Sequence, residues 1–229
     1  MALNFLISFI TLALMALLVS LNFRIGRFLN LSLGGLFAAG GYIAYFTPSP
    51  FVALIAGLIF GFLMALTISR ICRSITEATI LSLGAGILIE RFLEMIHRSS
   101  YYYFVSFDYS PYLVVLGILA YLIIFAVYTS PYGLKMKFVE SDHELAELYG
   151  VNTKRVFTVT TSLTSACAVL AGFFSSGLLA ISPTTGFGYL LSGIMVSALT
   201  AQFRQIGAVH YLTLLAVSFA SVRFLGVLI

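Results

Sequence analysis

The chain has 229 residues, of which 61% are hydrophobic and 9% are charged, and its formal net charge is +4 at pH 7. A soluble domain carries about 25% charged residues, so this composition excludes an ordinary soluble protein. No basic stripe interleaved with aromatic residues accompanies the positive charge, so a nucleic-acid partner is not indicated. We therefore interpret residues 1–229 as one membrane domain with the lipid bilayer as its solvent.

Eight apolar segments follow one another along the chain, separated by turn residues and short charged stretches. A membrane-spanning helix needs about 20 apolar residues to cross about 30 Å of hydrocarbon. The seventh segment is short, which leaves open a half-span or a tilted, buried helix. The predicted fold class is an all-α polytopic membrane protein with about eight transmembrane helices. The segments cover roughly residues 3–22, 29–46, 51–69, 78–96, 111–129, 156–180, 188–202 and 206–228.

The distribution of Lys and Arg between the two sides of these segments predicts the orientation of the chain. Cytoplasmic loops carry an excess of Lys and Arg, so the richer side is expected to be cytoplasmic and both termini are expected outside. The poorer side holds Arg91, Arg98 and Arg223. The richer side holds nine such residues, namely Arg24, Arg27, Arg70, Arg73, Lys135, Lys137, Lys154, Arg155 and Arg204.

Charge is concentrated in one cytoplasmic stretch, since residues 135–155 hold 8 of the chain's 20 charged side chains (12 Lys or Arg plus 8 Asp or Glu). Within this stretch, Ser141 and Glu144 have the spacing of a capping box, with Ser141 as the N-cap. Gly150 suits the left-handed residue that follows a helix. The pattern predicts a short helix of about eight residues over 142–149.

One face of this predicted helix is apolar, because Leu145, Leu148 and Tyr149 lie three and four residues apart. Two interpretations remain open. In the first, the helix is a turn in a solvated loop and its apolar face rests on the chain's own spans. In the second, the helix docks in a groove of a cytoplasmic partner.

Residues 133–156, GLKMKFVESDHELAELYGVNTKRV, closely resemble the cytoplasmic loop of ABC-transporter permeases of the branched-chain amino acid class. Residues 160–179 resemble the span rich in small residues that follows this loop in the family, and residues 30–42 resemble its Asn-x-(Ser/Ala)-x-Gly segment. The late glycine-rich turn of the family is replaced by residues 197–207, which retain little of it but Gly207. The loop positions that match the family are Gly133, Lys137, Glu140, Leu145, Ala146, Leu148, Gly150, Val151, Asn152 and Arg155.

This resemblance implies a permease subunit of an ATP-driven ABC importer in a prokaryotic cytoplasmic (inner) membrane. The imported solute would be a branched-chain amino acid or a related amino acid or amide. In this family the loop helix, here within the coupling loop 130–156, is the coupling helix that contacts an ATPase subunit. The residues expected to couple to the ATPase are Glu140, Asp142, Glu144, Leu145, Ala146, Leu148, Tyr149 and Gly150.

The same resemblance implies several partners. They are two ABC ATPase subunits, which would bind the ATP and Mg, a second permease subunit in a homodimer or heterodimer, and an extracytoplasmic substrate-binding protein. The chain itself is expected not to be an enzyme and to hold no cofactor or metal. It carries no Walker motif, no HExxH and no Ser–His–acid constellation.

Small and polar residues gather in two segments that share the sequence Leu-Ser-Leu-Gly, at residues 31–34 and 81–84. One interpretation is close helix packing through small side chains. The other is a translocation path, in which backbone groups beside an aqueous cavity contact a polar solute. The candidate path residues are Asn30, Ser32, Gly34, Gly35, Ser82 and Gly84.

Charged residues also lie near the outer end of the fourth segment, where Arg91 is three residues before Glu94 and Glu94 is four residues before Arg98. Mutual pairing is one explanation of these charges, and the neighbouring tyrosines suit an interfacial aromatic belt. The alternative is a docking patch for the external binding protein, formed by Glu94, Arg98, Tyr102 and Asp108.

A different class of function stays open, namely a small secondary transporter or channel without an ATPase partner. Proton or ion coupling usually needs ionisable residues near the midplane of the membrane. Asp and Glu are absent from the middle of every predicted span, and His210 and Arg223 in the last segment have no evident partner. The sequence therefore favours the ABC permease.

Overall fold

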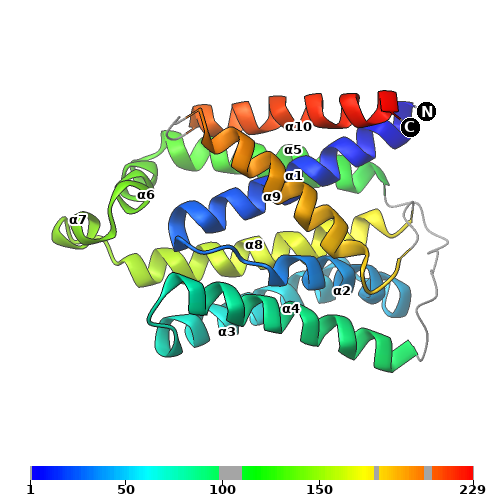
Figure 1. Ribbon diagram of the computed structural model, residues 1–229, viewed down its shortest axis with the longest axis horizontal. Coiled ribbons are helices and arrows are strands. Elements are labelled where there is room, and N and C mark those ends of the chain that lie inside the picture. Colours follow the sequence, from blue (N-terminus) through cyan, green and yellow to red (C-terminus); the bar gives the residue numbers. More distant parts are fainter. Residues whose placement is uncertain (1, 98–109, 178–180, 204–207, 229) are drawn as a thin grey trace.

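The computed structural model describes residues 2–97, 110–177, 181–203 and 208–228, and the regular elements over these ranges are ten helices (Figure 1). Helices α1–α5 and α8–α10 each fall on one of the eight predicted apolar segments, whereas α6 and α7 occupy the charged stretch. The helices are α1 (Ala2–Gly26), α2 (Ser32–Phe46), α3 (Pro50–Ile71), α4 (Ile75–His97), α5 (Ser110–Thr129), α6 (Pro131–Ser141), α7 (His143–Leu148), α8 (Thr153–Ser175), α9 (Thr185–Ala201) and α10 (Ala208–Leu228).

Four helices of the described chain are long and apolar enough to cross a membrane, which confirms an all-α multi-pass membrane protein. Helices α2, α9 and much of α10 are apolar but shorter, with 15 residues in α2 and 17 in α9. Helix α4 has 23 residues and carries Glu90, Arg91 and Glu94 towards its end. The number of eight spans therefore stays a prediction. The four long spans are Phe5–Gly26, Pro50–Ile71, Pro111–Thr129 and Thr153–Ser175.

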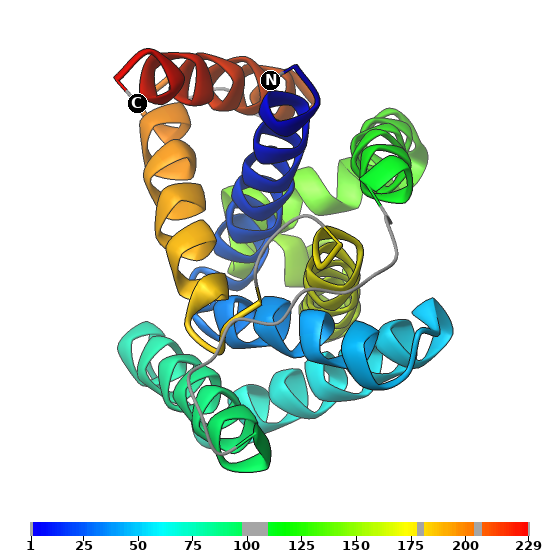
Figure 2. The same ribbon diagram turned by 90° about the vertical axis from the view of Figure 1, so that its right-hand side faces the viewer.

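Helices α1 and α8 lie at the centre of the bundle, with α2, α3, α5, α9 and α10 around them (Figure 2). Helix α8 packs against α1, α2 and α3, while α1 also packs against α5, α9 and α10. Leu14, Met15 and Leu17 of α1 are almost completely buried. A helix at the periphery of the bundle would leave such side chains to the lipid. Helix α1 is therefore an inner helix, held on most sides by protein.

Close backbone contacts join α2 to α8 at glycine positions. A Cβ atom on Gly172 of α8 would overlap the carbonyl oxygen of Phe37, and a Cβ atom on Gly40 of α2 would overlap the carbonyl oxygen of Val169. Lipid tails are as apolar as the helices, so helix association in a bilayer relies on van der Waals packing of this kind. The two helices therefore approach each other only because these positions lack side chains.

Helices α6 and α7 project from one end of the bundle, and both termini lie at the opposite end (Figure 1). We refer to residues 131–150 as the α6–α7 lobe. In the sequence, Pro131 and Gly133 indicate a turn, but Pro131 is the first residue of α6. Proline is favoured there because the first N–H groups of a helix have no partner within it. Helix α5 ends at Thr129, so the break that these residues indicate is present, and the predicted coupling loop, residues 130–156, is helical from Pro131.

Candidate functional site

Helix α7 begins one residue later than the sequence predicts. Its N-cap is Asp142, whose extended backbone (φ −155°, ψ 125°) lets the carboxylate accept a hydrogen bond from the N–H of Glu144 at 2.9 Å. The predicted capping box with Ser141 as the N-cap was wrong, because α6 continues through Ser141. The Ser141 hydroxyl instead donates to the carbonyl oxygen of Phe138, 3.0 Å away. Both Asp142 and Glu144 are exposed.

Helix α7 ends in a Schellman motif around Gly150, which has the left-handed conformation that the sequence predicts (φ 74°). The N–H of Gly150 donates to the carbonyl of Glu147 at 2.9 Å, and the N–H of Val151 donates to that of Ala146 at 3.0 Å. The Thr153 hydroxyl donates to the Glu147 carboxylate at 2.6 Å, which ties α7 to the start of α8. Both ends of α7 are thus capped, although it has six residues rather than about eight.

Much of the apolar face of α7 is exposed. Leu148 is 87% exposed, Tyr149 69% and Leu145 40%. Tyr149 stacks on Phe138 of α6, with the ring centroids 5.2 Å apart. Ala146, in contrast, is fully buried and faces the rest of the chain. The lobe therefore presents one apolar patch at its tip, while Ala146 packs α7 against the rest of the chain.

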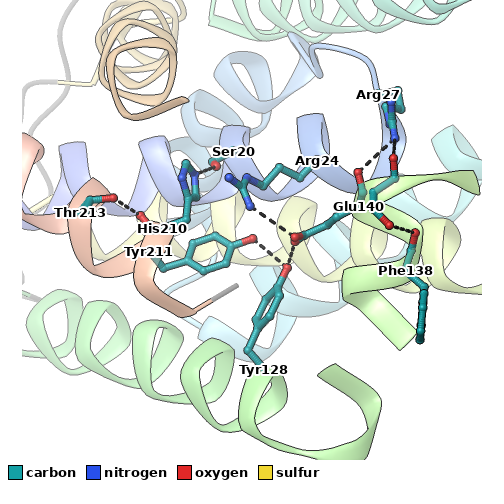
Figure 3. A network of polar contacts seen from close by, with 10 residues as sticks. Ser20, Arg24, Arg27, Tyr128, Phe138, Glu140, His210, Tyr211 and Thr213 are labelled. Atoms are coloured by element: carbon teal, nitrogen blue, oxygen red, sulfur yellow. Dashed lines mark hydrogen bonds and ion pairs between the residues drawn. The ribbon is translucent and has the colours of Figure 1, made fainter. Parts of the chain in front are cut away.

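Glu140 lies apart from this patch, at the buried end of α6. Its carboxylate pairs with Arg24 of α1, with Nη1 and Oε2 3.3 Å apart, and accepts a hydrogen bond from the hydroxyl of Tyr128 in α5 (Figure 3). The Tyr128 hydroxyl also lies 3.0 Å from that of Tyr211 in α10. Burial raises the pKa of the Glu140 carboxyl, and the contacts with Tyr128 and Arg24 oppose that rise. Glu140 thus links helices within the chain and is not part of the exposed face.

Arg27, directly after α1, holds the C-terminus of α6. Its Nη2 donates to the carbonyl oxygens of Glu140 and Ser141 at 3.0 and 2.9 Å (Figure 3). A cation is favoured at this place because the last carbonyls of a helix carry its negative dipole end. The backbone of Arg27 is left-handed, with φ 59°, which is uncommon for a residue other than glycine.

Sequence reasoning missed this link between α1 and the lobe. Ser20 and Arg24 are four residues apart and so lie on one side of α1, and Arg27 follows three residues later, directly after the helix. This spacing is the signal that could have indicated the link. The Ser20 hydroxyl lies 2.8 Å from Nε2 of His210, a buried residue of α10. The expectation that His210 lacks a partner was therefore wrong. Arg223 is exposed near the end of α10.

Candidate path residues from α2 and α4 come together at the start of α2. Ser82 of α4 accepts a hydrogen bond from the N–H of Leu31 at 3.1 Å and donates one to the carbonyl of Leu29 at 3.0 Å. The side-chain oxygen Oδ1 of Asn30 accepts hydrogen bonds from both the N–H and the hydroxyl of Ser32. The two Leu-Ser-Leu-Gly segments therefore contact each other.

The glycines of these segments differ in their surroundings. A Cβ atom on Gly35 would lie 2.7 Å from the carbonyl oxygen of Gly86 in α4, and one on Gly34 would lie 3.3 Å from that of Gly186 in α9. Gly84 is exposed, and a Cβ atom there would meet nothing within 4 Å. Gly34 and Gly35 thus serve close helix packing, while Gly84 lies apart from the other candidate path residues.

One of the four candidate docking residues for a binding protein is described by the structure. Glu94 pairs with Arg91, with Oε2 and Nη1 2.7 Å apart, so the predicted i, i+3 pair is confirmed. Arg98, Tyr102 and Asp108 lie outside the described residues. The docking patch as a whole therefore stays a prediction.

The helices, their lipid-length spans and the projecting lobe define a multi-pass membrane protein of the all-α class. A family model described as "Branched-chain amino acid transport system / permease component" matches residues 1–227. The chain therefore belongs to this family and is a permease component of a transport system that has other components. Comparison with curated proteins and comparison with solved structures each gave no significant match.

Proposed function

We propose that this chain is the membrane-spanning subunit of an ATP-driven ABC importer and that α7 is its coupling helix. The observation that carries the proposal is the exposed apolar face of α7, with Leu148 87% exposed at the tip of the lobe. A six-residue helix is marginal by itself, because helix nucleation is costly. Here the Asp142 cap, the Gly150 turn and the buried Ala146 hold it in a helical form before any partner binds. A preorganised helix loses less conformational entropy when it docks in a groove.

The proposed mechanism is alternating access. Closure of two ATPase subunits, which bind ATP and Mg, would displace α7 and so re-orient the spans. The solute is proposed to be a branched-chain amino acid or a related amino acid or amide. It would be delivered by an extracytoplasmic substrate-binding protein.

The proposed path lies at the interface with a second permease subunit. A cavity within this chain, bordered by Phe37, Gly41 and Gly172, has a volume of about 10 Å³. That volume holds at most one water molecule and is too small for an amino acid. This favours a path between two subunits over a path through that part of the bundle.

The proposed location is a prokaryotic cytoplasmic membrane, with both termini outside. The lobe and the termini lie at opposite ends of the bundle, which agrees with the distribution of Lys and Arg. The lobe would then face the cytoplasm, where the ATPase subunits are expected.

Purification of the tagged chain from native membranes in mild detergent, with mass spectrometry of the co-purified proteins, tests this function. We expect an ATPase with a Walker motif to accompany the wild-type chain and to be lost in Leu148→Asp, because a carboxylate in an apolar groove is costly. Phe203→Asp is the matched control. Phe203 is 60% exposed and follows α9, on the predicted cytoplasmic side, so this variant should keep the ATPase.

Two results would contradict the proposal. Equal recovery of the ATPase with wild type and Leu148→Asp would remove α7 as the docking element. Recovery of the wild-type chain alone or as a homo-oligomer would favour the alternative, a secondary transporter or channel.

A further inference from the structure

The direction in which α7 leaves α6 is set at one corner of the chain. Helix α6 ends at Ser141, and Asp142 has an extended backbone before α7 begins. The last two carbonyl oxygens of α6, those of Glu140 and Ser141, both accept hydrogen bonds from the guanidinium of Arg27. One side chain from the end of α1 therefore holds the two peptide groups that immediately precede the N-cap of α7.

The backbone of Arg27 indicates that its side chain matters at this place. A left-handed conformation costs an L-residue roughly 1–2 kcal/mol, a cost that glycine avoids. Arg27 has φ 59° at the end of α1, where its N–H donates to the carbonyl oxygen of Phe23 at 2.9 Å. This is a position that usually favours glycine. The guanidinium is the part of Arg27 that reaches α6. Its two hydrogen bonds to the α6 carbonyls offset the free-energy cost of the left-handed backbone.

Two further residues of α1, Arg24 and Ser20, connect this corner to other helices of the bundle. Three residues before Arg27, Arg24 pairs with the buried carboxylate of Glu140. One turn further, Ser20 contacts His210 of α10. Figure 3 shows these side chains reaching from one side of α1 towards α6 and α10. A displacement of the α6 C-terminus is therefore opposed by α1, and through α1 by α10.

We propose that Arg27 is a positioning residue that fixes the orientation of α7 relative to α1, so that the lobe and α1 move together. The inference rests on the proposed function of α7 as the coupling helix. Arg24 holds the side chain of Glu140 near the end of α6, while Arg27 holds the two backbone carbonyls at the corner from which α7 departs. Arg27 is exposed, so its replacement leaves no buried charge and does not threaten folding as the loss of Arg24 would.

Distances between spin labels on α1 and α7 test the positioning role without any partner. Labels are placed at Phe23→Cys and Glu144→Cys, both exposed positions, after Cys72 and Cys167 are changed to serine. Arg27→Gly removes the guanidinium and relieves the left-handed backbone.

We expect Arg27→Gly to broaden the α1–α7 distance distribution and Arg27→Lys to restore part of the narrow distribution, since one ammonium can still reach a carbonyl. Arg155→Gln, which removes another exposed guanidinium near the lobe, should leave it unchanged. An unchanged distribution in Arg27→Gly would overturn the proposal.

The second measurement uses the complex purified with its ATPase and reconstituted in liposomes. Loss of two charge-assisted hydrogen bonds should reduce the solute transported per ATP hydrolysed about tenfold in Arg27→Gly, while co-purification of the ATPase stays within about twofold of wild type. Equal transport per ATP in the two proteins would overturn the proposal while the coupling function stands. Absence of an ATPase from the wild-type preparation would refute the proposed function instead, and the label distances would still decide the role of Arg27.

Discussion

Arg24 of α1 and Glu140 of α6 form an ion pair across 116 residues of sequence, with Nη1 and Oε2 3.3 Å apart. Both side chains are largely shielded from solvent, at 18% and 5% exposure. Tyr128 of α5 donates a further hydrogen bond to the same carboxylate. The pair therefore ties the first helix of the chain to the lobe that is proposed to meet the ATPase.

Removal of one member of this pair should destabilise the fold strongly. Glu140→Ala leaves the Arg24 guanidinium less compensated in a shielded place, so we expect a loss of about 3–5 kcal/mol in the free energy of unfolding. The double variant Arg24→Met with Glu140→Leu should recover most of that loss, because neither charge remains. Unfolding by denaturant in detergent micelles measures both values. A double variant as unstable as the single one would show that the ionic contact itself is not what Glu140→Ala removes.

The stability of the chain should also depend on pH through Glu140. Burial raises the pKa of its carboxyl, with Tyr128 and Arg24 opposing the rise, so the folded chain binds this proton more tightly than the unfolded chain. The stabilisation from this group is complete below the unfolded pKa of about 4.3 and is lost as pH rises through the folded pKa.

The melting temperature of wild type minus that of Glu140→Gln, measured from about pH 4 to 8 in detergent, should therefore fall as pH rises. Glu140→Gln removes the titrating group and keeps a side chain of similar size. A difference that increases with pH would mean that the ion pair with Arg24 outweighs burial.

Local chemistry made some of these features predictable from sequence. Each of the eight apolar segments holds one helix, because a run of apolar residues is itself the signal for a span. Gly150 was identified because a left-handed C-terminal residue depends on little beyond its own position. The spacing of Ser74 and Glu77, three residues apart, is a further local signal, that of a helix N-terminus. The Glu77 N–H donates to Ser74 Oγ at 3.2 Å, and the Glu77 carboxylate accepts from the N–H of Arg73 at 2.8 Å.

Features that depend on residues far apart in the sequence could not be predicted from local patterns. Glu140 fits the family's loop pattern, yet its role follows from Arg24, which belongs to a different helix. The His210 side chain contacts Ser20 only when α10 packs on α1. The N-cap of α7 is Asp142 and not the predicted Ser141, because α6 continues to Ser141. The extent of α6 was not evident from a stretch that begins with a proline.

Close packing between α2 and α8 predicts a sharp difference between two glycines. Gly172→Ala places a methyl group on the carbonyl oxygen of Phe37, a backbone atom that can move only with its helix. We expect it to cost about 1–3 kcal/mol of stability or more. Gly84→Ala is the control, since its methyl group meets nothing within 4 Å and alanine favours the helix by about 1 kcal/mol. Thermal unfolding in detergent compares the two. Equal melting temperatures would refute the close approach of α2 and α8.

The Schellman motif at the end of α7 predicts a local effect at the proposed coupling helix. Gly150→Ala keeps every side-chain contact, because a Cβ atom there meets nothing within 4 Å, but it strains the left-handed backbone at φ 74°. A strain of about 1 kcal/mol corresponds to about fivefold more frequent opening of α7. The opening can involve the whole helix, because α7 has only six residues.

Hydrogen–deuterium exchange of residues 146–151 in detergent measures this opening, because the N–H groups of Gly150 and Val151 are both bonded within the motif. Gly150→Asn should exchange more slowly than Gly150→Ala, since asparagine tolerates the left-handed region better. The melting temperature should change little in either variant, because the motif lies at the exposed tip of the lobe. Exchange in Gly150→Ala at the wild-type rate would show that α7 is held by its packing through Ala146 and not by its C-terminal cap.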